Sequence, residues 1–238
     1  EDGDVGEFAK LEADVLKAYD AYEFHVVYQR VSQFAAVELS AIYHDVIKDR
    51  MYTDAANSAR RRSSQTALHR MVTGLCQMLS PILAFTADEA WEFVPGRAGK
   101  SVHASDWRPQ PIARSGAETS AWGGLFLLRE KVLPELEKAR QAKEIGKALE
   151  AKLTLNGLGE LFVDAKAHEE ALRELLNVSQ LEVHANGDPN VPVLVRRADG
   201  QKCERCWHWE TDVGSQAEHP TICGRCVEAV GAVTAEQS

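Results

Sequence analysis

The sequence of 238 residues lacks any uninterrupted apolar run long enough to cross a membrane. A membrane-spanning helix needs about 20 mostly apolar residues. The opening residues also lack the apolar core of a secretory signal peptide. Cysteine is scarce, with five in the whole chain, and disulfide-rich secreted domains use far more. These absences predict a cytoplasmic protein with no membrane association.

Catalytic signatures are missing as well. The glycines of residues 96–100 lack the spacing and the hydroxyl residue of a phosphate-binding loop. There is no Gly-x-Ser-x-Gly elbow, and His168 is not followed by the second histidine of a zinc-protease helix. The chain therefore resembles a binding module more than a self-sufficient catalyst.

The net charge limits the kinds of binding partner that can be expected. The net charge of −9 argues against a protein that coats nucleic acid indiscriminately. Residues 44–70 are an exception, because they hold six basic residues and three acidic ones. A locally basic surface is therefore compatible with the acidic whole.

Four of the five cysteines form two Cys-x-x-Cys pairs, Cys203–Cys206 and Cys223–Cys226, with sixteen residues between the pairs. This spacing is typical of a tetrahedral four-thiolate zinc site, which leaves no open position for a substrate. Two disulfides or a redox pair are alternatives, but thioredoxin-like pairs occur singly. His208 and His219 could replace a thiolate, although four cysteines suffice. Cys76 lies in an apolar helical run and is expected to be a small core residue.

Apolar periodicity predicts the fold class. Residues 7–95 show apolar side chains at steps of three and four, typical of helices in a bundle. Pro81 is expected to end or kink one of them. Thr86 and Glu89 resemble a capping box that begins another. Residues 94–124, rich in glycine and proline, are expected to form a loop, and a further helix is expected from Leu125 to about residue 149, kinked or broken at Pro134.

Beyond residue 151 the apolar period shortens to two, which predicts strands around Leu153, Leu181 and Val193. Leu161–Val163 is interpreted as another strand, and residues 169–177 as a short helix. The expected architecture is mainly α: a helical bundle, a small α+β unit and a four-cysteine knuckle. The predicted domains are residues 1–124, 125–198 and 199–238.

Three stretches together resemble bacterial isoleucyl-tRNA synthetases. The first is residues 39–53 with Arg61-Arg62-Ser-Ser-Gln65-Thr66, continued by the Ser-Pro-Ile-Leu-Ala-Phe-Thr-Ala-Asp-Glu-Ala-Trp phrase of residues 80–91. The second is residues 145–152. The third is Lys202-Cys203-Glu-Arg-Cys206-Trp207-His208, together with His219-Pro-Thr-Ile-Cys223-Gly-Arg-Cys226. The resemblance covers roughly residues 20–230.

The resemblance implies a class I anticodon-binding bundle followed by a terminal zinc knuckle with one structural Zn²⁺. The family joins isoleucine to its tRNA with ATP, and its His-Ile-Gly-His-like and Lys-Met-Ser-Lys-Ser-like signatures are absent here. ATP and Mg²⁺ therefore belong to the catalytic domain that this piece lacks, and the fragment alone is expected to be inactive. The implied partners are isoleucine-accepting tRNA and the rest of the synthetase in cis, with the protein a monomer.

RNA loops are bound through cationic side chains and through stacking of unpaired bases. The expected RNA contacts are Lys48, Arg50, Arg60, Arg61 and Arg62 in the bundle, and Lys202, Arg205, Trp207 and Arg225 around the zinc. The same bundle cations could instead pair with Asp45, Asp49 and Asp54 on a solvated face. The cations at the knuckle could merely offset thiolate charge, and Trp207 could be the core of the ribbon.

Three rivals remain at this point. A valyl- or leucyl-type synthetase has a related bundle. Formamidopyrimidine-DNA glycosylases end in a similar knuckle, but they need an N-terminal catalytic proline. A zinc-stapled interaction module without RNA binding or enzyme activity is the third possibility.

Overall fold

The computed structural model describes residues 2–109, 115–188 and 190–236. The chain divides into two compact units, one made of Glu1–His44 and Ala59–Arg114, the other of Asp45–Ser58 and Ser115–Ser238. The predicted division into three domains stays a prediction, and the compact units place their boundaries elsewhere. Within the described ranges, no helix combines the length and hydropathy needed to cross a bilayer.

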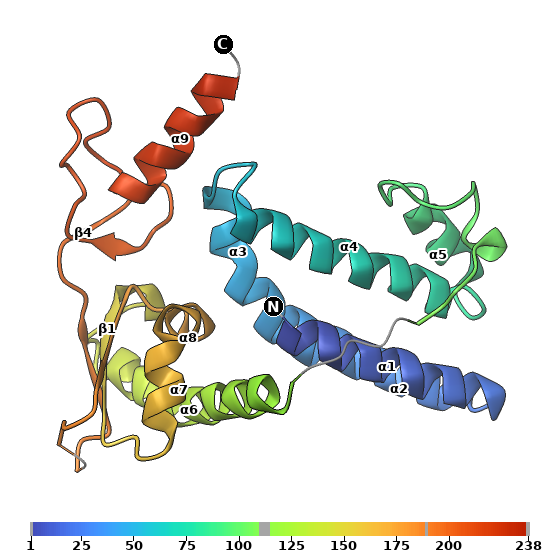
Figure 1. Ribbon diagram of the computed structural model, residues 1–238, viewed down its shortest axis with the longest axis horizontal. Helices are drawn as coiled ribbons and strands as arrows, with labels where there is room; N and C mark the ends of the chain where they lie inside the picture. The colour runs from blue at the N-terminus through green and yellow to red at the C-terminus, as the bar shows by residue number, and fades with distance from the viewer. Residues whose placement is uncertain (1, 110–114, 189, 237–238) are drawn as a thin grey trace. The chain divides into compact units, whose positions relative to one another are not determined.

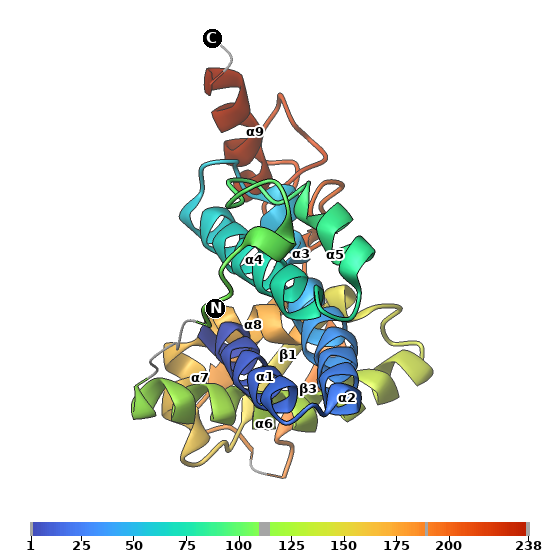
Figure 2. The same cartoon turned by 90° about the vertical axis from the view of Figure 1, so that its right-hand side faces the viewer.

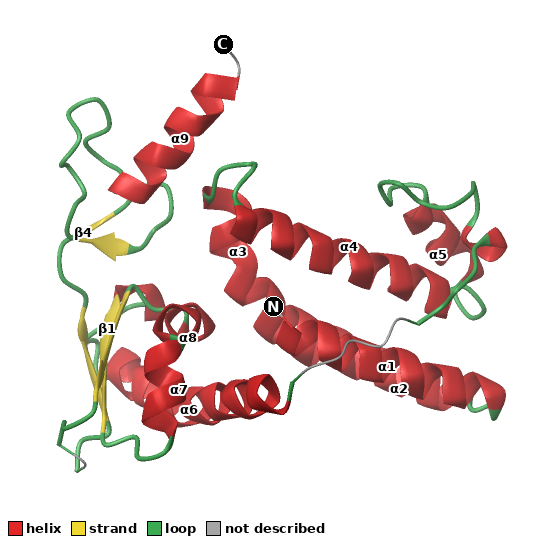
Figure 3. Ribbon diagram, in the orientation of Figure 1, coloured by secondary structure: helices red, strands yellow, loops and turns green. Residues whose placement is uncertain are grey.

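The first unit is helical, as the apolar stripes predict (Figure 3). Its helices are α1 (Asp2–Asp20), α2 (Phe24–Phe34), α4 (Ala59–Leu79) and α5 (Ala84–Trp91), with a π-helical stretch at Ala35–Tyr43 and a 3₁₀ turn at Val102–Ala104. α1 lies beside α2 and α4 (Figures 1 and 2). The rings of Phe8 and Phe34 meet in the core at 5.6 Å. α4 ends before Pro81, as predicted.

One predicted helix start is wrong. Thr86 does not cap α5, because the Ala87 N–H already donates to the Leu83 carbonyl oxygen at 2.8 Å, which places Thr86 inside the helix. The capping box belongs to Ser115 instead. Its Oγ accepts from the Glu118 N–H at 3.1 Å, and its own N–H donates to the Glu118 carboxylate at 2.8 Å.

That box begins α6 (Gly116–Gln141), so the expected loop is correct up to residue 109 and wrong from residue 116, while residues 110–114 lie outside the described residues. α6 does not break at Pro134, because Val132 and Leu136 on either side are buried. It ends at Gln141, well before the predicted residue 149. Lys143 then adopts a φ of 61°, which no helix allows.

The second unit contains a mixed sheet of β1 (Ala151–Asn156), β2 (Gln180–His184) and β3 (Val193–Arg197) in the order β2-β1-β3. β1 runs parallel to β2, with Leu153 opposite Leu181, and antiparallel to β3, with Leu153 opposite Val195. The predicted strands are therefore confirmed. Leu153 and Leu155 are fully buried.

Leu161–Val163 is helical, so the prediction of a strand there is wrong. This segment belongs to α7 (Leu161–Ala167), which is followed by α8 (Glu169–Leu176). Two parallel neighbours such as β1 and β2 need a crossover connection, and α7 and α8 provide it. β1 already has a partner on each edge, which leaves no place for a strand beside it.

The chain ends in a small ribbon. β4 (Gln201–Lys202) pairs with β5 (Trp209–Glu210), and α9 (Gly224–Glu236) follows. A 3₁₀ turn at Ala148–Glu150 leads into β1. The remaining helix, α3 (His44–Thr53), continues directly from the π-helical stretch, and from Asp45 onward it belongs to the second unit. The predicted mainly α architecture is confirmed.

Candidate zinc centre and nucleic-acid interface

The four paired cysteines converge on one point. Their Sγ atoms all lie within 4.8 Å of one another, and all four residues are buried. Cys206 Sγ and Cys223 Sγ are 3.8 Å apart, far beyond the roughly 2.05 Å of a disulfide. Four sulfurs at about 2.3 Å from a tetrahedral Zn²⁺ lie about 3.8 Å from one another. The donor set therefore fits zinc, and the disulfide alternative does not fit the geometry.

Local structure places each pair of cysteines. The turn between β4 and β5 carries Cys203 and Cys206, and it is closed by a hydrogen bond from the Cys203 N–H to the His208 carbonyl oxygen at 2.8 Å. Cys223 and Cys226 flank the start of α9. The Gly224 N–H there donates to Asp212 Oδ2 at 2.9 Å, and a Cβ on Gly224 would come within 2.7 Å of that oxygen. A side chain at residue 224 would therefore displace the Asp212 carboxylate from this hydrogen bond.

Electrostatics inside the cluster calls for a cation. Hydrogen bonding from Cys226 lowers the pKa of the Cys206 thiol to about 4, so this residue is a thiolate at neutral pH. Burial raises the pKa of the Cys223 thiol to about 11. The hydrogen bond to Cys206, followed by burial, raises the pKa of Cys226 far above its usual range. Of these three thiols only Cys206 is ionised at neutral pH without a metal, and a bound cation is needed for the others to become thiolate ligands.

As predicted, the two histidines do not replace a thiolate. His208 is buried, and its Nδ1 lies 3.1 Å from the Arg173 guanidinium. Burial lowers the pKa of His208, which keeps the ring neutral. Neither His208 nor His219 belongs to the cluster of converging donors within the described residues.

Three of the predicted RNA contacts form hydrogen bonds within the second unit, and their role in RNA binding stays a prediction. Arg225 donates to both carboxylate oxygens of Asp49 at 2.6 and 2.8 Å, and to Asp54 at 3.3 Å. Arg205 donates to the Thr53 carbonyl oxygen. Arg50 Nε donates to the Glu174 carboxylate at 3.1 Å. A guanidinium committed to buried carboxylates is poorly placed to bind phosphate as well.

The carboxylate of Asp49 is firmly ionised. Burial raises the pKa of this carboxyl, but the hydrogen bonds and charge of Arg225 outweigh that effect and bring the pKa to about 2. The pKa of Arg225 is raised, because the Asp49 carboxylate outweighs the burial of the guanidinium. Both partners are therefore charged at all physiological pH values.

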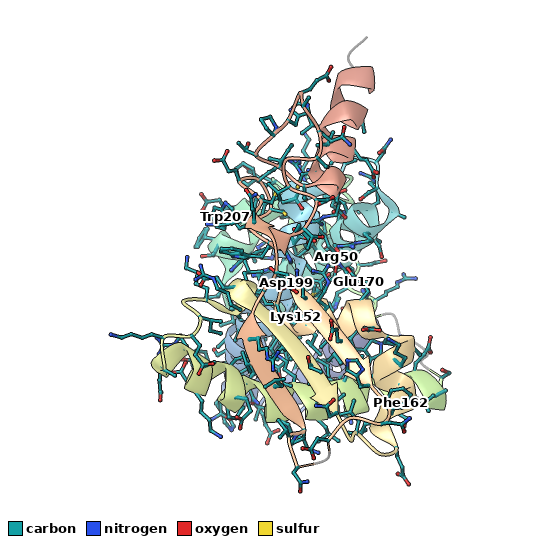
Figure 4. The ribbon with its side chains drawn as sticks, turned by 90° about the vertical axis from the view of Figure 1, so that its left-hand side faces the viewer. Arg50, Lys152, Phe162, Glu170, Asp199 and Trp207 are labelled. Atoms are coloured by element: carbon teal, nitrogen blue, oxygen red, sulfur yellow. The ribbon has the colours of Figure 1, made fainter. Side chains whose placement is uncertain are left out.

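Lys202 and Trp207 are the predicted contacts that face solvent at the knuckle. Trp207 is 58% exposed, and Lys202 Nζ lies 5.5 Å from the centroid of its ring. Figure 4 shows Trp207 at the surface of the ribbon. Its φ of 69° is a left-handed value that a tryptophan rarely adopts. The alternative that Trp207 is the ribbon core is wrong; Trp209, half-buried, packs against the Arg197 guanidinium at 4.8 Å.

The predicted basic patch of the bundle is divided between the two units. Lys48 is exposed in the second unit and forms an ion pair with Asp45 at 2.9 Å. Arg60, Arg61 and Arg62 lie in the first unit, at the start of α4. A joint surface of these cations stays a prediction.

Arg62 is exposed and donates to Gln65 at 3.0 Å. It lines a groove of about 620 Å³ together with Thr66, His69 and Pro95. His69 Nε2 lies 2.7 Å from the Pro95 carbonyl oxygen at the wall of this groove. The groove thus offers cationic and hydrogen-bonding groups on one helical face.

Sequence reasoning missed Glu174 and Arg173. Glu174 follows its partner Arg50 by 124 residues, and no local pattern distinguishes it from the exposed glutamates around it. In the sequence, Asp49 and Asp54 stand beside the bundle cations. In the structure, both also bind Arg225, more than 170 residues later in the chain.

Comparison with known proteins places the chain in a family. Residues 5–155 match the family model of the anticodon-binding domain of tRNA ligases, and residues 200–229 match the zinc finger found in FPG and IleRS. With the four converging thiols, the second match identifies the cysteine cluster as a structural zinc site.

Curated relatives agree with these family matches. The chain is 40% identical to an isoleucine–tRNA ligase of Cronobacter sakazakii, 38% to one of Sodalis glossinidius and 37% to one of Pectobacterium carotovorum, in each case over 95% of its own length. It spans about a quarter of each relative, 26%. The chain therefore belongs to the anticodon-binding domain family of tRNA ligases.

Proposed function

We propose that this chain is the C-terminal, anticodon-recognising region of a bacterial isoleucine–tRNA ligase. The observation that carries the proposal is the presence of both family matches, at residues 5–155 and 200–229, in one chain that aligns with these ligases over 95% of its length. The intact enzyme joins isoleucine to its tRNA with ATP. This region supplies tRNA binding, and the catalytic part, with its ATP and Mg²⁺, lies elsewhere in the protein.

The anticodon loop is a chemically suitable ligand for the exposed groups. Unpaired bases stack on aromatic rings, and their phosphates attract cations. Trp207 offers an open ring with Lys202 beside it. Lys48, Arg60, Arg61 and Arg62 supply positive charge on α3 and α4, and Arg62 is exposed beside its groove.

The proposal includes the setting in which the protein works. Four thiolates survive as zinc ligands only in a reducing compartment, which favours the cytoplasm. The remainder of the synthetase in cis is the expected partner, and the protein is expected to act as a monomer without a membrane. Size-exclusion chromatography with light scattering checks the last point.

Binding to tRNA is the direct test. We expect the zinc-loaded chain to bind isoleucine tRNA more tightly than valine tRNA in a filter-binding assay. The affinity is expected to fall steeply between 50 and 200 mM salt, as counterion release requires (about 0.7 to 0.9 in logarithmic slope per phosphate contact). Equal binding of both tRNAs would contradict the isoleucine assignment, and no binding would contradict RNA recognition.

A single substitution localises the contact. Trp207→Ala should weaken isoleucine tRNA binding by about 1–3 kcal/mol, the usual value of a base stacked on an aromatic ring. The matched control is Phe85→Ala, since Phe85 is also an exposed aromatic residue, at 92%, but lies on α5. Equal losses in the two variants would show that Trp207 is not a specific contact.

A further inference from the structure

The zinc ribbon (residues 201–226) is fastened to a helix that the chain completed about 150 residues earlier. Arg225, which directly precedes the ligand Cys226, makes a two-pronged contact with Asp49 at 2.6 and 2.8 Å, and its NH1 lies 3.3 Å from Asp54. Arg205, which directly precedes Cys206, donates to the Thr53 carbonyl oxygen at the end of the same helix. Each Cys-x-x-Cys pair thus has an arginine that binds residues 49–54.

The contact is largely withdrawn from water. The side chains of Arg225, Asp49 and Asp54 are 34%, 16% and 9% exposed. A guanidinium held by two carboxylate oxygens is a directional contact, which fixes orientation as well as distance. Both NH groups of Arg225 are engaged by aspartates, so its charge is neutralised within the protein.

The same helix is also held by α8. Arg50 binds Glu174 on α8, with side chains 15% and 6% exposed. The Asn177 side-chain amide donates to Asp45 at 3.1 Å, and Asn177 has the left-handed conformation that ends α8. The α3 segment (residues 45–54) is therefore fixed between α8 and the zinc ribbon, within one compact unit.

We propose that Asp49, Asp54 and Arg225 are positioning residues for tRNA recognition, which seat the zinc ribbon on the α3 segment and do not touch RNA. The inference rests on the proposed function. The seat fixes the ribbon that presents Lys202 and Trp207 relative to the helix that presents Lys48. In this proposal Arg225 is not itself an RNA contact, but holds the residues that contact RNA in position.

Asp49→Asn separates the two roles by the sign of its effect. If Arg225 bound phosphate, loss of its competing carboxylate would leave tRNA affinity unchanged or raise it. If Arg225 is a clamp, Asp49→Asn should lower affinity about tenfold, as should Arg225→Gln. The double variant should bind no worse than either single variant, because both remove the same contact.

Two further readouts exclude a general loss of structure. Affinities are compared where circular dichroism shows folded protein and elemental analysis gives one zinc per chain. Arg225→Gln should leave the salt slope unchanged, whereas loss of a phosphate contact would reduce it by about 1. Arg225→Lys should fail to restore affinity, because lysine keeps the charge but not the fork. Glu137→Gln, which removes an exposed carboxylate paired with Arg140 on α6, is the matched control and should bind normally.

Hydrogen exchange tests the seat without tRNA. Asp49→Asn should speed exchange in residues 45–54 and 201–226 together, while the β1–β2 pair keeps its protection. Asp54→Asn, which removes the longer contact, should show a smaller effect of the same kind. Unchanged exchange in both segments, or tRNA affinity that rises in Asp49→Asn, would overturn the inference. Failure of the wild-type chain to bind tRNA would instead overturn the proposed function and the recognition role with it, and the exchange data would still decide whether the seat exists.

Discussion

At the scale of single residues, the second unit depends on charges that are buried in pairs. Arg50 and Glu174 have side chains that are 15% and 6% exposed. A buried ion pair adds little net stability over an apolar pair, but loss of one partner leaves an uncompensated charge. The two residues should therefore behave very differently in single and double variants.

Arg50→Ala should lower the free energy of unfolding of the second unit by about 3–5 kcal/mol. The double variant Arg50→Met with Glu174→Leu should cost far less, since no charge is left buried. Urea denaturation followed by hydrogen exchange in β1 and β2 measures both.

The control for this comparison is Arg140→Ala, which breaks the exposed pair with Glu137. Solvent screens an exposed pair and it adds little to stability, so this variant should be near wild type. A double variant as unstable as Arg50→Ala alone would show that the residues matter separately and not as a pair.

At the scale of elements, close packing of helices depends on where glycine stands. A Cβ on Gly74 of α4 would meet the Phe8 ring at 2.7 Å and Glu12 Oε1 at 3.0 Å. Phe8 is fully buried, and Glu12 is held by Arg70 at 2.7 Å. Neither neighbour has room to move, so α1 and α4 approach each other as closely as they do because residue 74 has no side chain.

Gly74→Ala should therefore destabilise the first unit by about 1–3 kcal/mol, the usual cost of overpacking a core, despite the better helix propensity of alanine. Gly123→Ala on α6 is the same change with no atom within 4 Å of the new methyl group. It should stabilise the second unit by about 0.5–1 kcal/mol. Thermal unfolding checks both, and shifts of the same sign would contradict this account.

Elements were predictable where the signal is local. The stripes of α1 and α2 and the alternation of β1 and β2 repeat over several residues, and each period has one structural meaning. Leu161–Val163 is too short for a period to show, and its state was decided by the parallel pairing of β1 with β2, which requires a crossover between them. Likewise, Thr86-x-x-Glu89 and Ser115-x-x-Glu118 are alike in sequence, but only Ser115 is the N-cap residue of a helix.

The site residues show the same difference between local and long-range signals. The zinc ligands were predictable because two turns of fixed length specify them. The partners of Arg50, Arg205 and Arg225 were not predictable, because each lies more than a hundred residues away along the chain and no local pattern links an arginine to it. The fold brings two carboxylates and one carbonyl oxygen to these arginines, and the sequence does not mark them as partners.

At the scale of the whole molecule, loss of zinc should unfold one defined part of the chain. Removal of zinc with a strong chelator should unfold residues 199–236 and leave the helical first unit intact, because metal binding and folding are coupled in small thiolate sites. Elemental analysis should give one zinc per chain beforehand. Circular dichroism should then show most of the helical signal retained, and full unfolding would contradict the independence of the first unit.

The pairing of Asp49 with Arg225 spans 176 residues of chain. Ribosomes add about 5–20 residues per second. Asp49 is therefore synthesised many seconds before Arg225. Until Arg225 has been synthesised, Asp49 and Asp54 cannot form this contact. The contact between Asp49 and Arg225 can therefore form only after residue 225 has been synthesised, and a nascent chain stalled before that residue should lack it.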